Sequence, residues 1–264
     1  MSREIFAHHA HVFPPSVFPE GTVDDLLHVM DDCGIARCVA FAPFSRYVGD
    51  MDANAWLAKA IQSEDRLTGF GVINMDRDDM EAQVDRISEL GLRGIKMHPA
   101  FQRFSLMNEK ARRVYARAEA SGLFISFHTG IHWHRISEYN MLLFDEVAFH
   151  YPALRFSLEH AGGYCFFNDA VAVLLNNAAQ QPRVYAGMTS VCDRDMNRFW
   201  YLSDQQILDL IWLVGDDRLI FGLDFPYNDR QKIAQAIRRF EGMDLSEETK
   251  GKLFGGNIAR ILNA

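Results

Sequence analysis

Hydrophobic and polar positions alternate along this chain with two different periods. Apolar residues recur every three or four positions in the longer stretches, which is the period of an amphipathic helix. Between those stretches lie eight short runs rich in β-branched and aromatic residues, which predict buried strands. The runs are Glu4–His8, Arg37–Phe41, Thr68–Ile73, Leu92–Met97, Leu123–Phe127, Leu154–Leu158, Arg183–Ala186 and Arg218–Phe221.

Two of the predicted helices also have recognisable ends. They are Val23–Cys33 and Met80–Leu90. The hydroxyl of Thr22 can accept a free backbone N–H of the first turn, so Thr22 predicts the start of the first helix. Gly34 and Gly91 follow the two helices. Glycine adopts the left-handed conformation that commonly ends a helix, so both helices are expected to stop there.

The order of these elements predicts the fold class. Strands that alternate with helices in units of about 30 residues are expected to lie parallel, joined by crossover helices. No linker or change of composition divides the 264 residues, so we expect residues 1–264 to form one α/β domain, a (β/α)8 TIM barrel. A doubly wound open sheet is the alternative. It would normally place a glycine-rich phosphate-binding turn after the first strand, where this chain has His9-Ala10-His11 instead.

Composition and charge exclude several classes of protein. The 20 Phe and 4 Trp rule out a mainly disordered chain, and the net charge of −8 disfavours binding to nucleic acid. No segment approaches the ~18 apolar residues that span a bilayer, and the first residues lack the apolar core of a secretory signal. The four cysteines (Cys33, Cys38, Cys165 and Cys192) form no C-x-x-C pair. They are typical of reduced thiols in the cytoplasm.

Candidate chemistry begins at the end of the first predicted strand. His9 and His11 are two residues apart, so both should point to one side of the strand while His8 points to the other. Two imidazoles on one side can chelate one divalent ion. Chance histidines at a strand end would give the same pattern.

Further polar residues follow four of the other strands. Lys96 and His98 share one face after the fourth run, and single candidates follow the fifth, sixth and eighth runs: His128, His160 and Asp224. A lone histidine at a strand end is more often a packing residue. In a parallel barrel, however, all these strand ends meet at one mouth, so their joint placement predicts a functional site.

This set resembles the amidohydrolase superfamily, in particular the branch of metal-dependent hydrolases that includes aminocarboxymuconate-semialdehyde decarboxylase. The resemblance covers nearly the whole chain. It rests on the ordered combination of strand-end motifs rather than on any one of them: His9-Ala10-His11, Gly94-Ile95-Lys96-Met97-His98-Pro99, His128, His160-Ala161-Gly162-Gly163, Phe221-Gly222-Leu223-Asp224-Phe225-Pro226 and Gly256-Asn257-Ile258-Ala259-Arg260-Ile261-Leu262.

The resemblance implies a metal centre. His9, His11, His128 and Asp224 would bind one divalent ion, and His160 would be the catalytic acid or base. Three imidazoles and one carboxylate suit Zn²⁺ best and also accommodate Mn²⁺, Fe²⁺, Co²⁺ or Ni²⁺. The family often has Asp two residues before the first histidine, where this chain has Ala7. That departure concerns the surroundings of the ligand pair rather than the pair itself.

The expected reaction is hydrolysis of a small amide, lactone or ester by metal-activated water, with Asp224 or His160 accepting the proton. Decarboxylation of a small carboxylated enal or phenol at the same centre is the alternative. A deoxyribonuclease of the same superfamily would be expected to carry a metal-binding Glu at the fourth strand, where this chain has Lys96 and His98. A non-catalytic metal-binding barrel and a barrel with a Schiff-base lysine are the remaining alternatives, and the latter leaves the histidines unexplained.

Other residues are predicted to shape the substrate site. Lys96 and His98 would bind the substrate, which can carry a carboxylate. A carboxylated Lys96 that bridges two metals and a structural ion pair are alternatives for Lys96, and a structural hydrogen bond is the alternative for His98. Arg46 and Tyr47 can reach an anionic substrate from their loop, although an exposed surface arginine is the alternative. Trp133 is interpreted as pocket wall. His132 and His134 are interpreted as polar lining, His28 and His150 as structural, and Glu159 as facing away from His160 toward the helices. By resemblance a homodimer or a larger assembly is expected.

Overall fold

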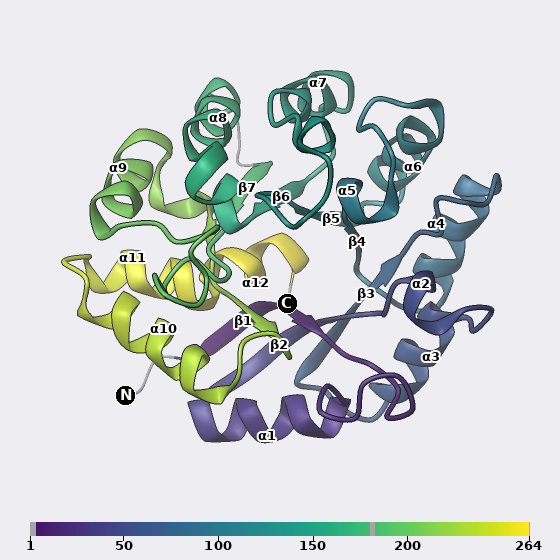
Figure 1. The fold of residues 1–264 in the computed structure, drawn as a ribbon, viewed down its shortest axis with the longest axis horizontal. Coiled ribbons are helices and arrows are strands. Elements are labelled where there is room, and N and C mark those ends of the chain that lie inside the picture. The colour runs from purple at the N-terminus through teal and green to yellow at the C-terminus, as the bar shows by residue number, and fades with distance from the viewer. Residues whose placement is uncertain (1–3, 180–182, 264) are drawn as a thin grey trace.

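The parallel strands of the protein close into a barrel (Figure 1). The computed structural model describes residues 4–179 and 183–263, so the first three residues of the N-terminal stretch considered above lie outside the described part. Seven strands follow one another in chain order: β1 (Ile5–His11), β2 (Ile35–Phe41), β3 (Leu67–Val72), β4 (Gly94–Met97), β5 (Phe124–His128), β6 (Phe156–Glu159) and β7 (Val184–Gly187).

The eighth position is shared by two short strands. β8 (Leu219–Ile220) pairs with β7, and β9 (Gly222–Phe225) pairs with β1. Phe221 connects them, and its carbonyl accepts the backbone N–H of His8 at 2.8 Å. The ring is therefore continuous through this segment, and the predicted single-domain (β/α)8 barrel is confirmed. The run predicted as Arg218–Phe221 is in fact the first half of a strand position that extends to Phe225.

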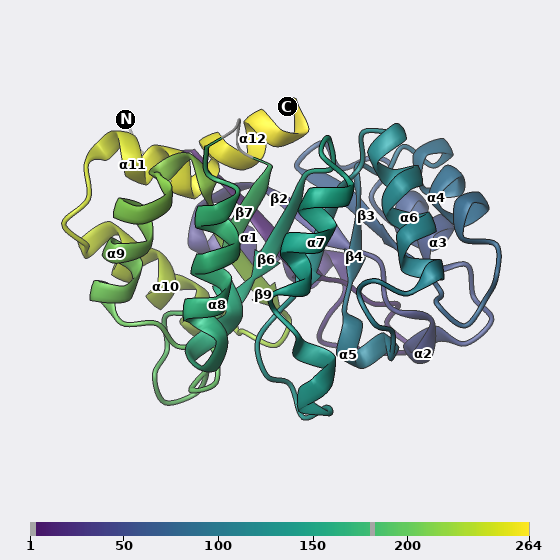
Figure 2. The same ribbon diagram turned by 90° about the horizontal axis from the view of Figure 1, so that it is seen from above.

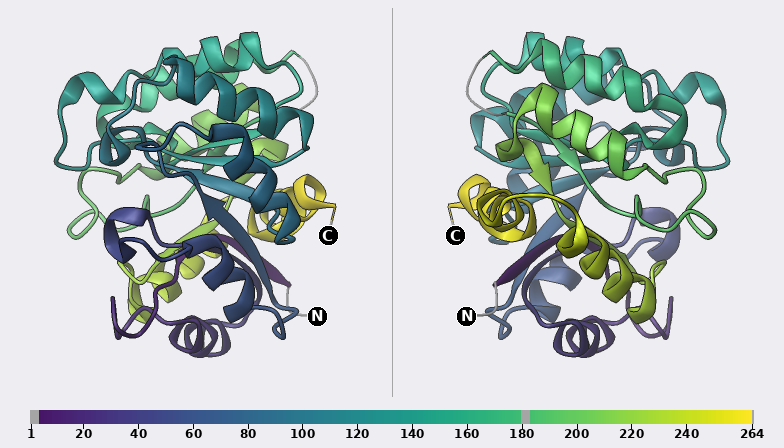
Figure 3. Two further views of the ribbon diagram at one scale, coloured as in Figure 1. Left: turned by 90° about the vertical axis from the view of Figure 1, so that its right-hand side faces the viewer. Right: turned by 90° about the vertical axis from the view of Figure 1, so that its left-hand side faces the viewer.

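Helices surround the strands on all sides (Figures 1 and 3). No helix in the described part of the chain is both long enough and apolar enough to cross a bilayer. Short 3₁₀ turns are η1 (Ile136–Tyr139), η2 (His160–Gly162) and η3 (Asp216–Arg218), and η4 (Lys252–Gly256) is a π-helical turn. The helices are α1 (Val23–Cys33), α2 (Ser45–Val48), α3 (Ala53–Ala60), α4 (Met80–Glu89), α5 (Pro99–Gln102), α6 (Glu109–Ala120), α7 (Leu143–His150), α8 (Gly163–Asn176), α9 (Asp204–Val214), α10 (Arg230–Gly242), α11 (Glu247–Gly251) and α12 (Asn257–Leu262).

The predicted helix ends are confirmed at α1. Thr22 and Asp25 form a reciprocal capping box, in which each side chain accepts from the other residue's backbone N–H. Gly34 ends the helix at φ 68°, in the left-handed region. The second helix ends one residue earlier than predicted, at Glu89, and Gly91 follows at φ 74°.

Apolar side chains fill the N-terminal end of the barrel. Phe6, Phe70 and Phe124 pack there against Ile258 and Ile261 of α12. Figure 2 shows α12 at one end of the barrel, with α2 and α5 at the opposite end. Because α12 and the aromatic layer close one end, polar side chains that project inward near the strand carboxyl ends are left at the other, as is usual in such barrels.

Gly94 has no room for a side chain, and this yields a stability prediction. A Cβ at this position of β4 would lie 2.6 Å from the Phe124 carbonyl oxygen and 2.6 Å from the Phe70 ring. We expect Gly94→Ala to lower the free energy of unfolding by about 1–3 kcal/mol, the usual range for overpacking, in urea titrations. Gly251→Ala is the matched control because nothing lies within 4 Å of its Cβ. Equal losses in both variants would contradict the prediction.

Candidate active site

A cavity of about 150 Å³ lies at the polar end of the barrel. It collects side chains that lie on or just after β1, β2, β4, β5, β6, β7 and β9, which are far apart in the sequence. Seven of the predicted site residues line it, whereas Arg46 and Trp133 do not. The lining residues are His9, His11, Phe44, Tyr47, Lys96, His98, Phe101, His128, His132, His160, Trp200, Asp224 and Tyr227.

A bulge in β1 turns three histidines toward the barrel interior. His9 has φ 66°, and the pairing of β1 with both neighbouring strands shifts register around it. The extra residue interrupts the alternation of the strand. His8 therefore also faces inward, where its ring contacts those of Phe41 and Phe70. The expectation that His8 points away from His9 and His11 was wrong for this reason.

Three of the predicted ligands converge in the cavity. His9 Nε2 lies 3.2 Å from His11 Nε2 and 3.3 Å from Asp224 Oδ1, and His11 Nε2 lies 3.8 Å from the same oxygen. The hydroxyl of Ser190 donates to the other oxygen, Oδ2, at 2.7 Å. One carboxylate oxygen is thus held by the protein, and the other faces both imidazoles.

The protonation pattern of this group fits a divalent cation. His9 Nδ1–H donates to Glu159 Oε2 at 2.8 Å, so Nε2 carries the lone pair. Burial lowers the pKa of His11 well below its usual value. Burial opposes ionisation of Asp224, but the neighbouring imidazoles of His9, His160 and His11 still place the pKa of its carboxyl well below the usual range. A neutral His11 with its proton on Nδ1 adds a second nitrogen lone pair, and a donor set of two imidazoles and one anionic oxygen suits a first-row metal.

His128 lines the same cavity but has a different arrangement. Its ring stacks on that of His98 with centroids 3.8 Å apart, and its Nε2 lies 3.2 Å from the Gly130 carbonyl oxygen. An Nε2–H that donates to this carbonyl leaves Nδ1 as the nitrogen with a free lone pair. Burial lowers the pKa of His128 well below its usual value, which keeps the imidazole neutral.

His160 is oriented as a neutral base. It follows β6 at the start of η2, and its Nδ1–H donates to the Thr189 carbonyl at 2.8 Å. The opposite nitrogen, Nε2, therefore carries the lone pair. The ring stacks on Trp200 with centroids 4.7 Å apart and lies 5.5 Å from the ring of His9. Burial lowers the pKa of His160 to about 4, although Asp224 opposes this shift.

Lys96 and His98 add two donors to the cavity. Lys96 Nζ is 3.4 Å from His9 Nε2, and burial lowers its pKa to about 8 against the opposing charges of Glu159 and Asp224. His98 Nδ1 accepts the backbone N–H of Phe101, so Nε2 carries the proton. His98 Nε2 is buried without a hydrogen-bond partner.

Comparison with known proteins now identifies the family. A family profile described as Amidohydrolase matches residues 8–264, almost the entire chain. The protein belongs to the amidohydrolase family. It is therefore a metal-dependent enzyme, which agrees with the convergence of His9, His11 and Asp224. A search among curated proteins gave no match.

Solved structures share the barrel of this amidohydrolase at low sequence identity. 5-Carboxyvanillate decarboxylase from Sphingomonas paucimobilis has a TM-score of 0.76 and 17% identity, over 99% of both chains. A protein described as a 2-pyrone-4,6-dicarboxylic acid hydrolase from Pseudomonas putida has a TM-score of 0.73 and 19% identity, over 100% of this chain and 98% of the other. An amidohydrolase from Burkholderia multivorans with bound zinc has a TM-score of 0.71 and 19% identity, over 98% and 99%.

Two predicted substrate contacts lie outside the cavity of the amidohydrolase. Arg46 is exposed on α2, with its guanidinium 5.7 Å from the Phe101 ring. Trp133 is 75% exposed and packs edge-on against Phe199. The tryptophan that does line the cavity is Trp200, which stacks between His160 and His132. Sequence reasoning missed it because Trp200 follows β7 in a long loop with no strand or helix pattern.

Glu159 also lies elsewhere than the sequence pattern predicts. It is fully buried inside the barrel, where Ser126, Ser157 and Thr189 donate to its carboxylate. The prediction assumed that alternation continues past the strand end. His160 already lies in η2 at φ 63°, so Glu159 and His160 both face inward. Ser157 was the signal that could have placed Glu159 correctly. Residues two apart in a strand share a face, so Glu159 is expected on the same side of β6 as the polar Ser157.

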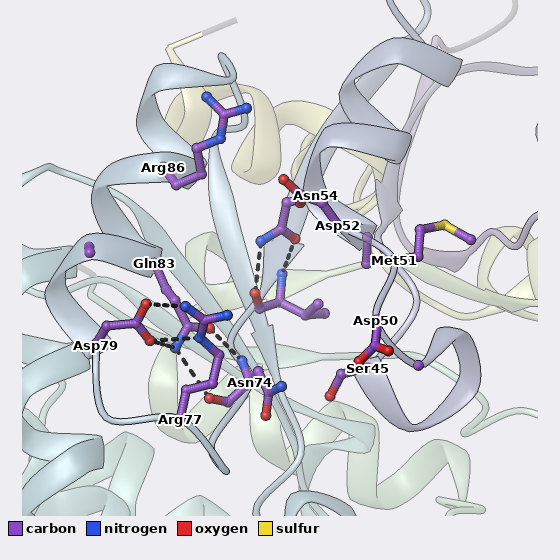
Figure 4. A pocket seen from close by; sticks show the side chains of 14 residues that line it. Ser45, Asp50, Met51, Asp52, Asn54, Asn74, Arg77, Asp79, Gln83 and Arg86 are labelled. Carbon is purple, nitrogen blue, oxygen red and sulfur yellow. Dashed lines mark hydrogen bonds and ion pairs between the residues drawn. The ribbon is translucent and has the colours of Figure 1, made fainter.

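A larger cavity of about 360 Å³ lies elsewhere in the amidohydrolase, between α3, β3 and α4. Several of its polar side chains are bonded to one another or to the backbone (Figure 4): Arg77 to Asp79, Gln83 to Asn74 and Asp79, and Asn54 to Val72. It contains none of the clustered histidines, so its size does not make it the active site.

Proposed function

We propose that this amidohydrolase hydrolyses a small, carboxylate-bearing amide, lactone or ester. The observation that carries the proposal is the convergence of His9 Nε2, His11 Nε2 and Asp224 Oδ1 within 3.2–3.8 Å of one another. His160 supplies a neutral imidazole beside them. A metal site that is open to a cavity and has a base within reach is the arrangement expected for metal-assisted hydrolysis.

The proposed ion is Zn²⁺, held by His9, His11 and Asp224 with His128 as the fourth ligand. When bound, the ion polarises the substrate carbonyl and lowers the pKa of a water ligand to about 7. A nitrogen-rich set with one carboxylate favours zinc over the harder ions such as Mn²⁺. The zinc-containing amidohydrolase from Burkholderia multivorans shares the same fold.

The chain's own residues supply binding and proton transfer. His160 Nε2 accepts the proton of the attacking water and returns it to the leaving group, while Thr189 fixes the ring through Nδ1. The ammonium of Lys96 and the Nε2–H of His98 bind the substrate carboxylate. The unpartnered Nε2 of His98 supports this role because a buried donor without an acceptor is costly until a ligand supplies one.

Decarboxylation of a small carboxylated phenol or enal is the second candidate. The buried Lys96 ammonium lies 3.4 Å from His9 Nε2, so a carboxylate bound to Lys96 would lie at the metal centre. Among the proteins of the same fold, the one from Sphingomonas paucimobilis is a 5-carboxyvanillate decarboxylase.

A two-substrate assay on the zinc-loaded enzyme separates these reactions. One arm uses 2-pyrone-4,6-dicarboxylate with a pH indicator to detect acid release, and the other uses 5-carboxyvanillate with detection of CO₂. Hydrolysis predicts acid release from the pyrone and no CO₂ from the phenol; decarboxylation predicts the reverse. If loaded enzyme acts on neither these compounds nor a panel of related lactones, amides, esters and hydroxybenzoates, the proposal fails.

Metal removal should also lower thermal stability. An ion that binds only the folded state at a concentration a thousandfold above Kd stabilises by about 4 kcal/mol. For a chain of this length we expect the Tm to fall by roughly 8–16 °C after dialysis against a chelator, and to recover with added Zn²⁺. Calorimetry on the apo and reloaded protein measures this, and identical Tm values would contradict a metal centre.

We further propose that the enzyme acts in the cytoplasm on free small molecules, as a homodimer, rather than on nucleic acid or at a membrane. The free thiols of all four cysteines support a reducing compartment. Light scattering of the purified chain measures the oligomeric state, and a monomeric mass would refute the homodimer.

A further inference from the structure

A carboxylate lies buried directly beneath the proposed metal centre. Glu159 is the last residue of β6 and has no exposed surface. Its contacts come from four barrel positions: His8 and His9 on β1, Ser126 on β5, Ser157 on β6 itself, and Thr189 just after β7. Burying a charged group this deeply costs free energy unless hydrogen bonds compensate for the lost water. The presence of a carboxylate at this position therefore suggests that Glu159 has a specific role.

The two carboxylate oxygens have different partners. Oε1 accepts the hydroxyls of Ser126 and Ser157 and lies 3.4 Å from His8 Nδ1. Oε2 accepts Thr189 Oγ1 at 3.0 Å and His9 Nδ1–H at 2.8 Å. One oxygen is therefore anchored mainly by serines, and the other is aimed at the ring of His9.

We propose that Glu159 is the positioning residue of the metal centre and acts through His9. By accepting the Nδ1–H, it selects the tautomer of His9 whose Nε2 lone pair faces Asp224 and His11. A carboxylate bonded to the far nitrogen of a metal-binding histidine also makes that histidine a stronger electron donor. This inference rests on the proposed metal centre.

The backbone of β1 supports the assignment. His9 has φ 66°, a left-handed conformation that is uncommon for a residue with a side chain. His9 makes its contact with Glu159 from within this bulge. A strained residue at a functional site is expected where the surrounding contacts hold it in place, and the 2.8 Å bond to Glu159 is such a contact.

Space for the carboxylate is provided by a glycine on the neighbouring strand. A Cβ at Gly187 would clash with Glu159 Oε2, the oxygen that holds His9. Alanine at this position would therefore displace Oε2 without changing any charge or removing any hydrogen-bonding group. It offers a second way to disturb the His9 contact, independent of substitution at Glu159.

The experiment compares Glu159→Gln with the matched control Ser126→Ala, which removes a partner of Oε1 only. Zn²⁺ affinity is measured by competition with a chromogenic chelator. We expect Glu159→Gln to weaken Zn²⁺ binding 10–100-fold, the usual effect of losing such a partner. Gly187→Ala should weaken it in the same direction, and Ser126→Ala should change it little. Equal affinities in wild type and Glu159→Gln, or an equal loss in Ser126→Ala, would overturn the proposal.

A second measurement needs no metal. In the apoprotein, ¹⁵N NMR of the imidazoles should show His9 protonated at Nδ1, with the population moving toward Nε2–H in Gly187→Ala. If the spectra show Nε2–H in the wild type, the inference is wrong even when zinc binds tightly. If the tautomer is as expected but zinc does not bind, the proposed metal function fails while the role of Glu159 in fixing His9 stands. The NMR arm also covers the case in which Glu159→Gln does not fold.

Discussion

Asp224→Asn is expected to lose the metal and to lower kcat/KM by at least about a thousandfold, equivalent to some 4 kcal/mol of transition-state stabilisation. Asparagine has the same shape and can still accept the Ser190 hydroxyl, which contacts Oδ2 at 2.7 Å. The change removes the only anionic donor of the proposed set, which faces His9 and His11 at 3.3 and 3.8 Å. Metal content by elemental analysis should fall from about one ion per chain to a small fraction.

Asp229→Asn, the same substitution five residues later in the chain, is the control for Asp224→Asn. Asp229 is exposed and caps α10 by accepting the Lys232 N–H at 3.0 Å. Asparagine caps helices about as well as aspartate, so Asp229→Asn should keep both metal and turnover. An Asp224→Asn variant that retains one ion per chain and wild-type kinetics would disprove the role assigned to Asp224.

His160→Asn is expected to keep the metal but lower kcat by about 10²–10⁴-fold, the usual contribution of a positioned acid or base. The asparagine amide can replace Nδ1–H as the donor to the Thr189 carbonyl, so the local fold should persist. It offers no counterpart to Nε2, which carries the lone pair toward the cavity. The two variants therefore predict different phenotypes: Asp224→Asn loses metal and rate, whereas His160→Asn loses rate alone.

Steady-state kinetics with parallel metal analysis distinguishes these phenotypes. His28→Asn, an exposed histidine on α1, is the matched control and should behave as the wild type. Loss of metal in His160→Asn would show that His160 acts as a ligand instead of a base. Full activity in this variant would show that a residue other than His160 transfers the proton, and Asp224 would be the remaining candidate.

Several features of the site could be predicted because they depend on short-range rules. Helix α1 runs from Val23 to Cys33 as its apolar period and Thr22 cap indicate. Lys96 and His98 both line the cavity, as alternation along β4 predicts. The barrel itself brings the polar strand-end residues together, since parallel strands place their carboxyl ends at one mouth. These residues are His9, His11, Lys96, His98, His128, His160 and Asp224.

Other features escaped prediction where a local rule is interrupted. His8 points into the barrel instead of away from it, because the bulge at His9 adds one residue to β1 and shifts the alternation of its side chains. Glu159 faces inward because the strand ends there and His160 begins a 3₁₀ turn. The choice of Trp200 over Trp133 as cavity wall depends on how two long loops fold over the mouth. Loop conformation is set by packing among segments distant in sequence, and residue pattern alone does not specify it.

The sequence by itself determined the alternation of strands and helices, and hence the barrel and the ring of polar residues at its open end, because period and capping act within a few residues. Only the tertiary structure decided which nitrogen of each histidine faces the centre. That choice depends on hydrogen bonds such as those of His9 with Glu159, His160 with Thr189 and His98 with Phe101. The first two of these pairs join different barrel positions and the third is set by the start of α5, so each exists only once the strands have closed and the turns at the mouth have formed.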